Sequence, residues 1–203
     1  SGIDKLSAIT LEADVIFPKY PANAGNYSKN FSSLNSSVMG MDGVEHTSDT
    51  DDLTWPDTNI NISSSLQILA VRKENQTSND NPEVFFMVSG SMLSAPITSS
   101  VYTNVYDNSK WKLAVRIKHR SQKTGLDFVS SSAGNDTIDV EFFGAQMIAD
   151  TVLNQFKVSG SLVEASKYGP FIEPKRIYCG AHRTNFTGSI LNRSDVFTSN
   201  VRY

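Results

Sequence analysis

The segment TIDVEFFG, residues 137–144, carries two acidic side chains two positions apart, Asp139 and Glu141. Successive side chains of a β-strand point to opposite faces, so Asp139 and Glu141 share one face with Thr137. The other face carries three apolar residues, Ile138, Val140 and Phe142. Two carboxyl groups roughly 6.5–9.5 Å apart can hydrolyse a glycosidic bond with inversion, one as acid and one as base. A retaining route needs a nucleophilic carboxylate roughly 5 Å from the acid, and Thr137 cannot replace it.

A second strand pattern gives these acids a structural role instead. In KWKLAVRIK, residues 110–118, apolar and polar side chains alternate. One expected face carries Trp111, Leu113, Val115 and Ile117, and the other carries Lys110, Lys112, Arg116 and Lys118. Opposite charges on neighbouring strands attract, so the two acids can lie on a solvated face opposite Lys112 and Arg116. We adopt this interpretation and predict that Asp139, Glu141 and Lys112 are accessible, while the apolar residues of both segments are buried.

Two oxygen-rich loop clusters contain side chains that Ca²⁺ prefers. The clusters are Asp49, Asp51 and Asp52, and Asn79, Asp80 and Asn81. Neither cluster follows a spaced metal-binding motif. Metal-ligand spacing is also absent from the three histidines, His46, His119 and His182. We therefore expect no cofactor, with Ca²⁺ at the first cluster as the alternative.

Aromatic and polar residues in expected loops are the candidate ligand contacts. The aromatic candidates are Trp55, Tyr102 and Tyr106. They lie where an aromatic platform for a sugar would sit, although loop aromatics often anchor a loop to the core instead. Gly180 and Gly188 bracket a further loop, because a residue without Cβ can adopt a positive φ. Its candidates for contact with a ligand or partner are His182, Arg183 and Asn185.

The hydrophobic pattern of the whole chain is that of an all-β protein. Residues 9–17, ITLEADVIF, alternate apolar and polar side chains until Pro18 ends the pattern. Further strands are predicted near residues 66–73, 83–90, 110–118, 137–144, 154–164, 175–181 and 194–203. Residues 145–155 are compatible with one short helix. We predict a single antiparallel β-sandwich over residues 1–203, with a long loop excursion over residues 19–65 interrupted by a strand near residues 31–39.

Composition disfavours several function classes. Of 203 residues, 58 are Ser, Thr or Asn and 19% are charged, which disfavours long amphipathic helices. The net charge of −3 and the lack of a Lys/Arg-rich run argue against nucleic acid as a partner. No apolar run approaches the roughly 18 residues of a membrane span. Cys179 is the only cysteine, which excludes an internal disulfide, and its strand pattern predicts a small buried side chain.

Other features bear on the origin of the chain. The sequence begins SGIDK without an initiator methionine, so we expect a processed piece of a longer protein. Asn-x-Ser/Thr sequons favour a glycosylated extracellular domain as one alternative, although so much Ser, Thr and Asn also produces sequons by chance. The sequons lie at Asn26, Asn30, Asn35, Asn61, Asn75, Asn135, Asn185 and Asn192.

Three segments resemble the laminin-G-like, concanavalin A-type jelly-roll family. Residues 111–117, WKLAVRI, are similar to the W-x-x-[AV]-V strand of that family. Residues 177–203 resemble its closing pattern, and ITLEADVIF resembles its first strand. The resemblance implies a jelly-roll β-sandwich in which the strand at residues 9–17 pairs with the strand at residues 194–203.

Residues 180–188, GAHRTNFTG, are similar to jelly-roll modules in structural proteins of marine bacteriophages and related viruses. This resemblance implies a module on the virion surface that contributes to particle assembly, decoration or host attachment. The implied partners are other virion subunits, further copies of the same chain in a homo-oligomer, and a cell-surface glycan.

The acidic segment resembles the Glu-x-Asp-x-Glu strand of jelly-roll glycoside hydrolases of the laminarinase and xyloglucan-transglycosylase type. The first Glu is the nucleophile in those enzymes, and Thr137 stands in its place. We therefore expect a non-enzymatic module. The alternatives are a polysaccharide hydrolase that uses Asp139 and Glu141, and an extracellular adhesion domain.

Overall fold

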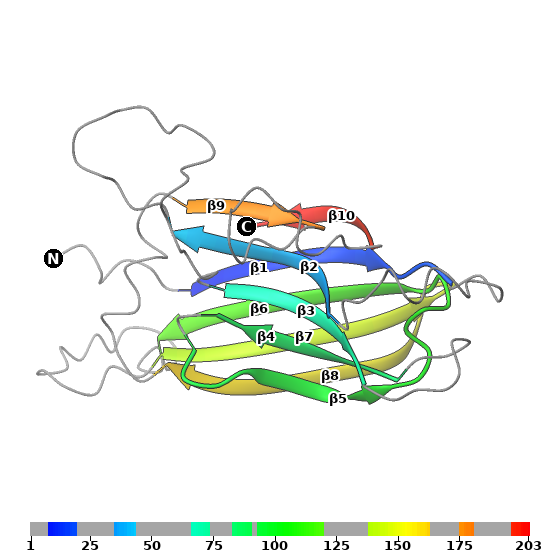
Figure 1. Cartoon of the computed structure of the whole chain (residues 1–203), viewed down its shortest axis with the longest axis horizontal. Helices are drawn as coiled ribbons and strands as arrows, with labels where there is room; N and C mark the ends of the chain where they lie inside the picture. Colours follow the sequence, from blue (N-terminus) through cyan, green and yellow to red (C-terminus); the bar gives the residue numbers. More distant parts are fainter. Residues whose placement is uncertain are drawn as a thin grey trace, which may run out of the picture.

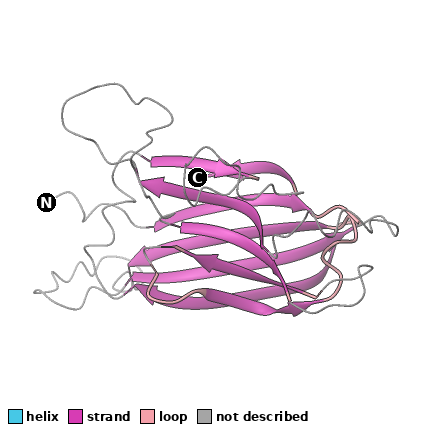
Figure 2. Ribbon diagram, in the orientation of Figure 1, coloured by secondary structure: helices cyan, strands magenta, loops and turns pink. Residues whose placement is uncertain are grey.

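The computed structural model describes residues 8–19, 35–43, 66–73, 83–90, 93–119, 138–162, 175–180 and 196–203. Within these ranges the chain forms strands and no helix (Figure 2). The strands are β1 (Ala8–Ile16), β2 (Asn35–Gly43), β3 (Leu66–Arg72), β4 (Val84–Ser89), β5 (Ile97–Tyr102), β6 (Lys110–His119), β7 (Ile138–Ile148), β8 (Thr151–Leu162), β9 (Lys175–Cys179) and β10 (Phe197–Arg202). The predicted all-β class is therefore confirmed. The predicted strand near residues 31–39 overlaps β2, which extends to residue 43.

Two antiparallel sheets pack face to face as a β-sandwich (Figure 1). We call the sheet with the strand order β10-β1-β6-β7-β8 the front sheet and the sheet with the order β5-β4-β3-β2-β9 the back sheet; the two names are labels and do not describe the view in Figure 1. In the front sheet β1 pairs with β10 on one side and with β6 on the other. The predicted pairing of the strands at residues 9–17 and 194–203 is therefore confirmed.

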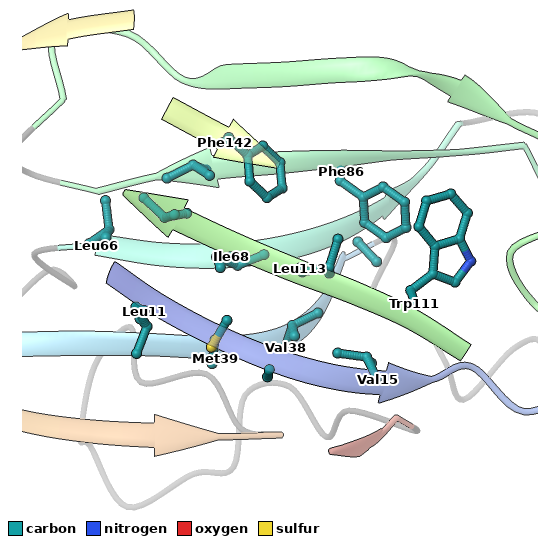
Figure 3. Packing of buried hydrophobic residues seen from close by; sticks show 14 of the residues in the cluster. Leu11, Val15, Val38, Met39, Leu66, Ile68, Phe86, Trp111, Leu113 and Phe142 are labelled. Carbon is teal, nitrogen blue, oxygen red and sulfur yellow. The ribbon is translucent and has the colours of Figure 1, made fainter. Parts of the chain in front are cut away.

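The core lies between the two sheets and follows the alternation of the strands. Along β6, Trp111 and Leu113 are fully buried, and so is Phe142 of the neighbouring strand β7. Figure 3 shows these side chains facing Phe86 and Ile68 of the back sheet. The other buried residues predicted for these strands are Val115, Ile117 and Val140. Lys112 is exposed as predicted, and the side chain of Ile138 lies outside the described residues.

Residues 145–155 form a hairpin, so the helix proposed for them is wrong. They comprise the end of β7, a two-residue turn and the start of β8. The turn residues Ala149 and Asp150 have φ values of 44° and 63°, as the central residues of a type I′ hairpin turn require. The long register with β8 aligns Ala145 with Gln155 and satisfies the backbone groups that a helix would pair locally.

Cys179 is exposed, which contradicts the predicted burial. It is aligned in register with the buried Met39, so its side chain lies on the core side of the back sheet. The strand β9 is the edge strand of that sheet, however, and its neighbour Ile177 is 38% exposed as well. The alternation of β9 was interpreted correctly, but the core does not extend beneath this edge.

An aromatic ring covers the glycine of β7. Gly144 is opposite Phe156 in the β7–β8 register, and a Cβ at Gly144 would lie 2.1 Å from Phe156 Cε1. Gly144→Ala is expected to lower the free energy of unfolding by about 1–2 kcal/mol, because the ring must leave its contacts with Phe86 and Phe142. Urea denaturation measures the loss. In a Phe156→Leu background the loss should shrink, and an unchanged loss would show that the ring is not the obstacle.

Candidate functional site

The outer face of the front sheet collects most of the charged side chains that the sequence placed on strands. Cross-strand pairs in register define rows across this face. One row joins Arg202, Glu12, Ala114, Phe143 and Lys157 from β10 to β8. The next row joins Asp14, Lys112, Ala145 and Gln155. A third row places Arg116 directly beside Glu141.

Glu141 is buried, although it was predicted to be accessible. Its side chain is 8% exposed because three cations cover it on the outer face. Arg116 donates from Nε to Oε2 at 2.7 Å and pairs with the same oxygen through Nη2. Lys118 and Lys157 approach Oε1 at 3.2 and 2.9 Å. The predicted opposition of this acid and Arg116 is therefore confirmed, whereas Lys112 is aligned with Ala145 instead.

These cations keep Glu141 ionised. Burial alone would raise the pKa of Glu141, but the hydrogen bonds from Lys157, Arg116 and Lys118 outweigh it and lower the pKa to about 2. A general acid at neutral pH needs the opposite shift, toward a raised pKa. Glu141 in this environment is suited to holding cations in place and is poorly suited to donating a proton.

Asp139, the second acid of the predicted pair, lies in the next row of the same face. It is half-buried and is aligned in register with Lys118. Thr137, which occupies the position of the nucleophile in the resembled hydrolases, lies outside the described residues. The outer face of the front sheet therefore carries a network of two carboxylates on β7, with basic residues beside them on β6 and β8.

A groove of about 760 Å³ lies on the outer face beside this network. It is lined by residues from all five strands of the front sheet. The small side chains Ala114 and Ala145 leave room at its centre, and Phe143 adds an aromatic surface. Its charged side chains are Glu12, Asp14, Lys112, Lys157 and Arg202. Two amides, Gln155 and Asn200, add both donors and acceptors.

Asp14 fixes the β1–β10 side of the groove. Lys110 lies 2.6 Å from Asp14 Oδ2, and Asn200 donates to the same oxygen at 2.8 Å. Burial alone would raise the pKa of Asp14, but these two hydrogen bonds and the charges of Lys110 and Lys112 lower it. Asn200 reaches this position from a left-handed backbone conformation with φ of 49°, at an irregularity of the β1–β10 register.

Phe143 lies between two cations of the network. The guanidinium carbon of Arg116 is 5.5 Å from the ring centroid, and Lys157 Nζ is 5.3 Å from it. Both distances are in the range of cation–π contacts. These contacts place Lys157 beside the groove while it also reaches Glu141.

Two of the aromatic candidates for ligand contact, Tyr102 and Tyr106, pack against core residues instead. Tyr106 is 2% exposed, within hydrogen-bond distance of Ser36 Oγ at 3.1 Å, and its ring lies 5.3 Å from that of Phe17. Tyr102 is half-buried at the end of β5, with its ring centroid 5.2 Å from that of Trp111. Tyr106 therefore anchors its loop to the core, and neither ring lines the groove.

The remaining predicted site residues lie outside the described residues. These are Trp55, His182, Arg183 and Asn185, together with both Ca²⁺ clusters, Asp49, Asp51 and Asp52, and Asn79, Asp80 and Asn81. The sequence interpretation missed the groove residues Glu12, Asp14, Asn200 and Arg202. Alternation along ITLEADVIF places Glu12 and Asp14 on one face, but it does not identify the strands on either side.

Neither a search of the described residues for metal and membrane sites nor a comparison with known proteins identifies a function for this chain. Within the described ranges, no three His, Cys, Asp or Glu side chains gather as a metal site. The described part of the chain also lacks a helix with the length and hydrophobicity to cross a membrane. Searches of protein-family models, curated proteins and solved structures find no match to this chain. The groove and its side chains are the features from which function can be argued.

Proposed function

We propose that this β-sandwich is a non-enzymatic surface module that binds a glycan in the groove on the outer face of the front sheet. The groove carries this proposal, because it is open, spans five strands and combines small side chains with polar ones. Rigid strands position every side chain that lines it, so the site needs no loop closure to form.

The chemistry of the groove suits a sugar. Sugar hydroxyls both donate and accept hydrogen bonds, and the groove presents amides, carboxylates and ammonium groups to them. The small residues Ala114 and Ala145 leave space for a ring, and Phe143 offers an apolar surface for the C–H face of a sugar. Small-molecule sites combine apolar surface with precisely placed polar groups, and Phe143, Ala114 and Ala145 supply the apolar part here.

The state of Glu141 supports binding over hydrolysis. A glycosidase acid is protonated before the reaction, whereas Glu141 lies among three cations that keep it charged. Its partner in an inverting mechanism would be Asp139, which is next to Lys118 in register. The rival proposal of a polysaccharide hydrolase would therefore have to disrupt this network before catalysis.

We further propose that the module belongs to the surface of a phage-like particle, where glycan binding would serve host attachment. The resemblance of residues 180–188 to phage structural modules supports this setting, and the jelly-roll topology implied by the same resemblance belongs to the proposal. An extracellular adhesion domain is the alternative setting, which the sequons favour. The same groove would serve either setting.

A binding assay with a blocked groove tests the function. Affinity electrophoresis against laminarin, xyloglucan, dextran, dextran sulfate and polygalacturonate should show binding to at least one polymer without release of reducing ends. Ala145→Trp should weaken that binding by about tenfold or more, which corresponds to about 1.4 kcal/mol. Thr98→Trp on the exposed face of β5 is the matched control and should bind as the parent does.

Two outcomes would contradict the proposal. Binding that Ala145→Trp leaves unchanged would place the ligand elsewhere, and absence of binding to all five polymers would remove the glycan function. Turnover that Glu141→Gln abolishes would instead establish the hydrolase.

A further inference from the structure

We propose that the glycan carries acidic groups, carboxylates or sulfates, and that Lys112 and Lys157, on the two strands that flank β7, bind them. This inference rests on the proposed function, since it names the class of glycan that the same groove would take. It is carried by the distribution of charge over the outer face and by the unequal pairing of its cations.

The outer face of the front sheet has the opposite charge balance to the whole chain. Its cations are Lys110, Lys112, Arg116, Lys118, Lys157 and Arg202, and its carboxylates are Glu12, Asp14, Asp139 and Glu141. Cations therefore outnumber carboxylates on this face, although the chain as a whole has a net charge of −3. A local excess of positive charge attracts anionic ligands even on an acidic protein.

The excess is concentrated on β6 and β8. Glu141 is shared by Arg116, Lys118 and Lys157, and Asp139 is aligned with Lys118, so three cations face two carboxylates here. The side chain of Lys157 is 54% exposed, and an ammonium group has three donors, so it can contact a ligand while it pairs with Glu141. Lys112 is exposed and forms no ion pair within the described part of the chain.

The two lysines approach the groove from opposite sides. Lys112 on β6 is aligned with Ala145, and Lys157 on β8 is aligned with Phe143, so β7 lies between them. Ala145 has no side chain beyond Cβ and leaves the groove open beside Lys112, whereas Lys157 Nζ lies 5.3 Å from the Phe143 ring centroid and 2.9 Å from Glu141 Oε1. Acidic groups spaced along one glycan chain would each receive a charge-assisted hydrogen bond from one of the two lysines.

The carboxylates of the groove restrict the kind of anion. Asp14 is held by Lys110 and Asn200, and Glu12 lies 3.3 Å from Arg202, so both carboxyl groups line the groove beside the ligand. A nucleic acid has a phosphate at every nucleotide and would bring several of them near these carboxylates. A polysaccharide with acid groups separated by hydroxyls can place an acid at the lysines and hydroxyl donors at Glu12 and Asp14. The charge pattern therefore favours an acidic glycan.

Matched polymers separate the acid group from the sugar backbone. Binding is measured in 0.15 M NaCl to dextran and dextran sulfate, and to polygalacturonate and its methyl ester, with poly-L-glutamate and single-stranded DNA as non-sugar polyanions. We expect dextran sulfate or polygalacturonate to bind about tenfold more tightly than its uncharged partner. The pair that shows the difference identifies sulfate or carboxylate as the recognised group.

Single lysine substitutions locate the interaction. Lys112→Gln should weaken acidic-polymer binding about tenfold, the usual effect of losing one charge-assisted hydrogen bond, and should weaken the binding of uncharged polymers less, because glutamine still offers a donor to a sugar hydroxyl. Lys73→Gln removes an equally exposed charge from the end of β3 and should leave all binding unchanged. Melting curves of both variants should nearly coincide with that of the parent, since Lys112 forms no ion pair among the described residues and the Lys73–Glu83 pair lies on an exposed surface, where it contributes little.

Three results would overturn the inference. Equal binding of charged and uncharged partners, with no effect of Lys112→Gln, would refute the acidic class and leave the proposed glycan function standing. Equally tight binding of poly-L-glutamate or DNA would show that the face recognises charge alone. If none of the four polysaccharides binds, this inference fails, and the proposed function fails with it only if laminarin and xyloglucan do not bind either.

Discussion

Replacing Trp111 with alanine is expected to lower the free energy of unfolding by about 3–5 kcal/mol. The indole is fully buried between the two sheets, with its ring 4.7 Å from that of Phe86 and 5.2 Å from that of Tyr102. Its Nε1 has no hydrogen-bond partner among the described residues, so the loss comes from packing rather than from a broken hydrogen bond. Trp111→Phe, which keeps an aromatic ring, should therefore cost much less.

Urea denaturation monitored by circular dichroism measures the change in the free energy of unfolding, and thermal unfolding measures the change in melting temperature. The melting temperature of Trp111→Ala should fall by about 10 °C for a domain of this size. Lys112→Ala is the matched control, because Lys112 is the next residue of β6 and points outward. If Trp111→Ala melts within about two degrees of the parent, the assignment of this face to the core is wrong.

Glu141→Gln is expected to lower the free energy of unfolding by about 2–3 kcal/mol at pH 7, and the loss should depend on pH. The pKa of Glu141 is about 2 in the folded protein and 4.5 for a free side chain. As the pH falls, the unfolded chain takes up the proton first, so the contribution of Glu141 is complete above about pH 4.5 and disappears as the pH falls through 2. The difference between parent and variant should therefore be large at pH 7 and smaller at pH 3.

Denaturation curves at several pH values between 2 and 7 test this expectation. Glu83→Gln is the control, because its carboxylate pairs with Lys73 on an exposed surface, where an ion pair contributes little. A difference between parent and Glu141→Gln that stays constant from pH 7 to pH 2 would mean that the carboxylate is not held by its three cations.

The core could be predicted from the sequence because its signal is local. Alternation in KWKLAVRIK places Trp111 and Leu113 on one face, and a single strand carries the whole pattern. The same rule separated Phe142 from Glu141 in the neighbouring segment. It also matched Glu141 with the correct partner, Arg116, since opposite charges on two strands predict adjacency.

The site could not be predicted, because it depends on which strands are neighbours. Glu141 is covered partly by Lys157 of β8, and although residues 154–164 were predicted as a strand, the sequence did not show that this strand lies beside β7. Asp14 and Asn200 form one corner of the groove although 186 positions separate them. The exposure of Cys179 could not be predicted for a related reason. Its strand pattern was interpreted correctly, but its exposure depends on how far the core extends beneath the edge strand β9.

The position of β1 between β6 and β10 has a consequence for synthesis of the protein. During translation β6 follows β1 by about a hundred residues, whereas the Asn200 partner of Asp14 emerges 186 residues after it. The nascent chain can therefore assemble the β1–β6–β7–β8 part of the front sheet while the other edge of β1 still exposes unpaired backbone groups. Such an edge invites pairing with neighbouring chains. Pairing with β10, the last of the described strands to be synthesised, covers this edge of β1 and removes the exposed backbone groups.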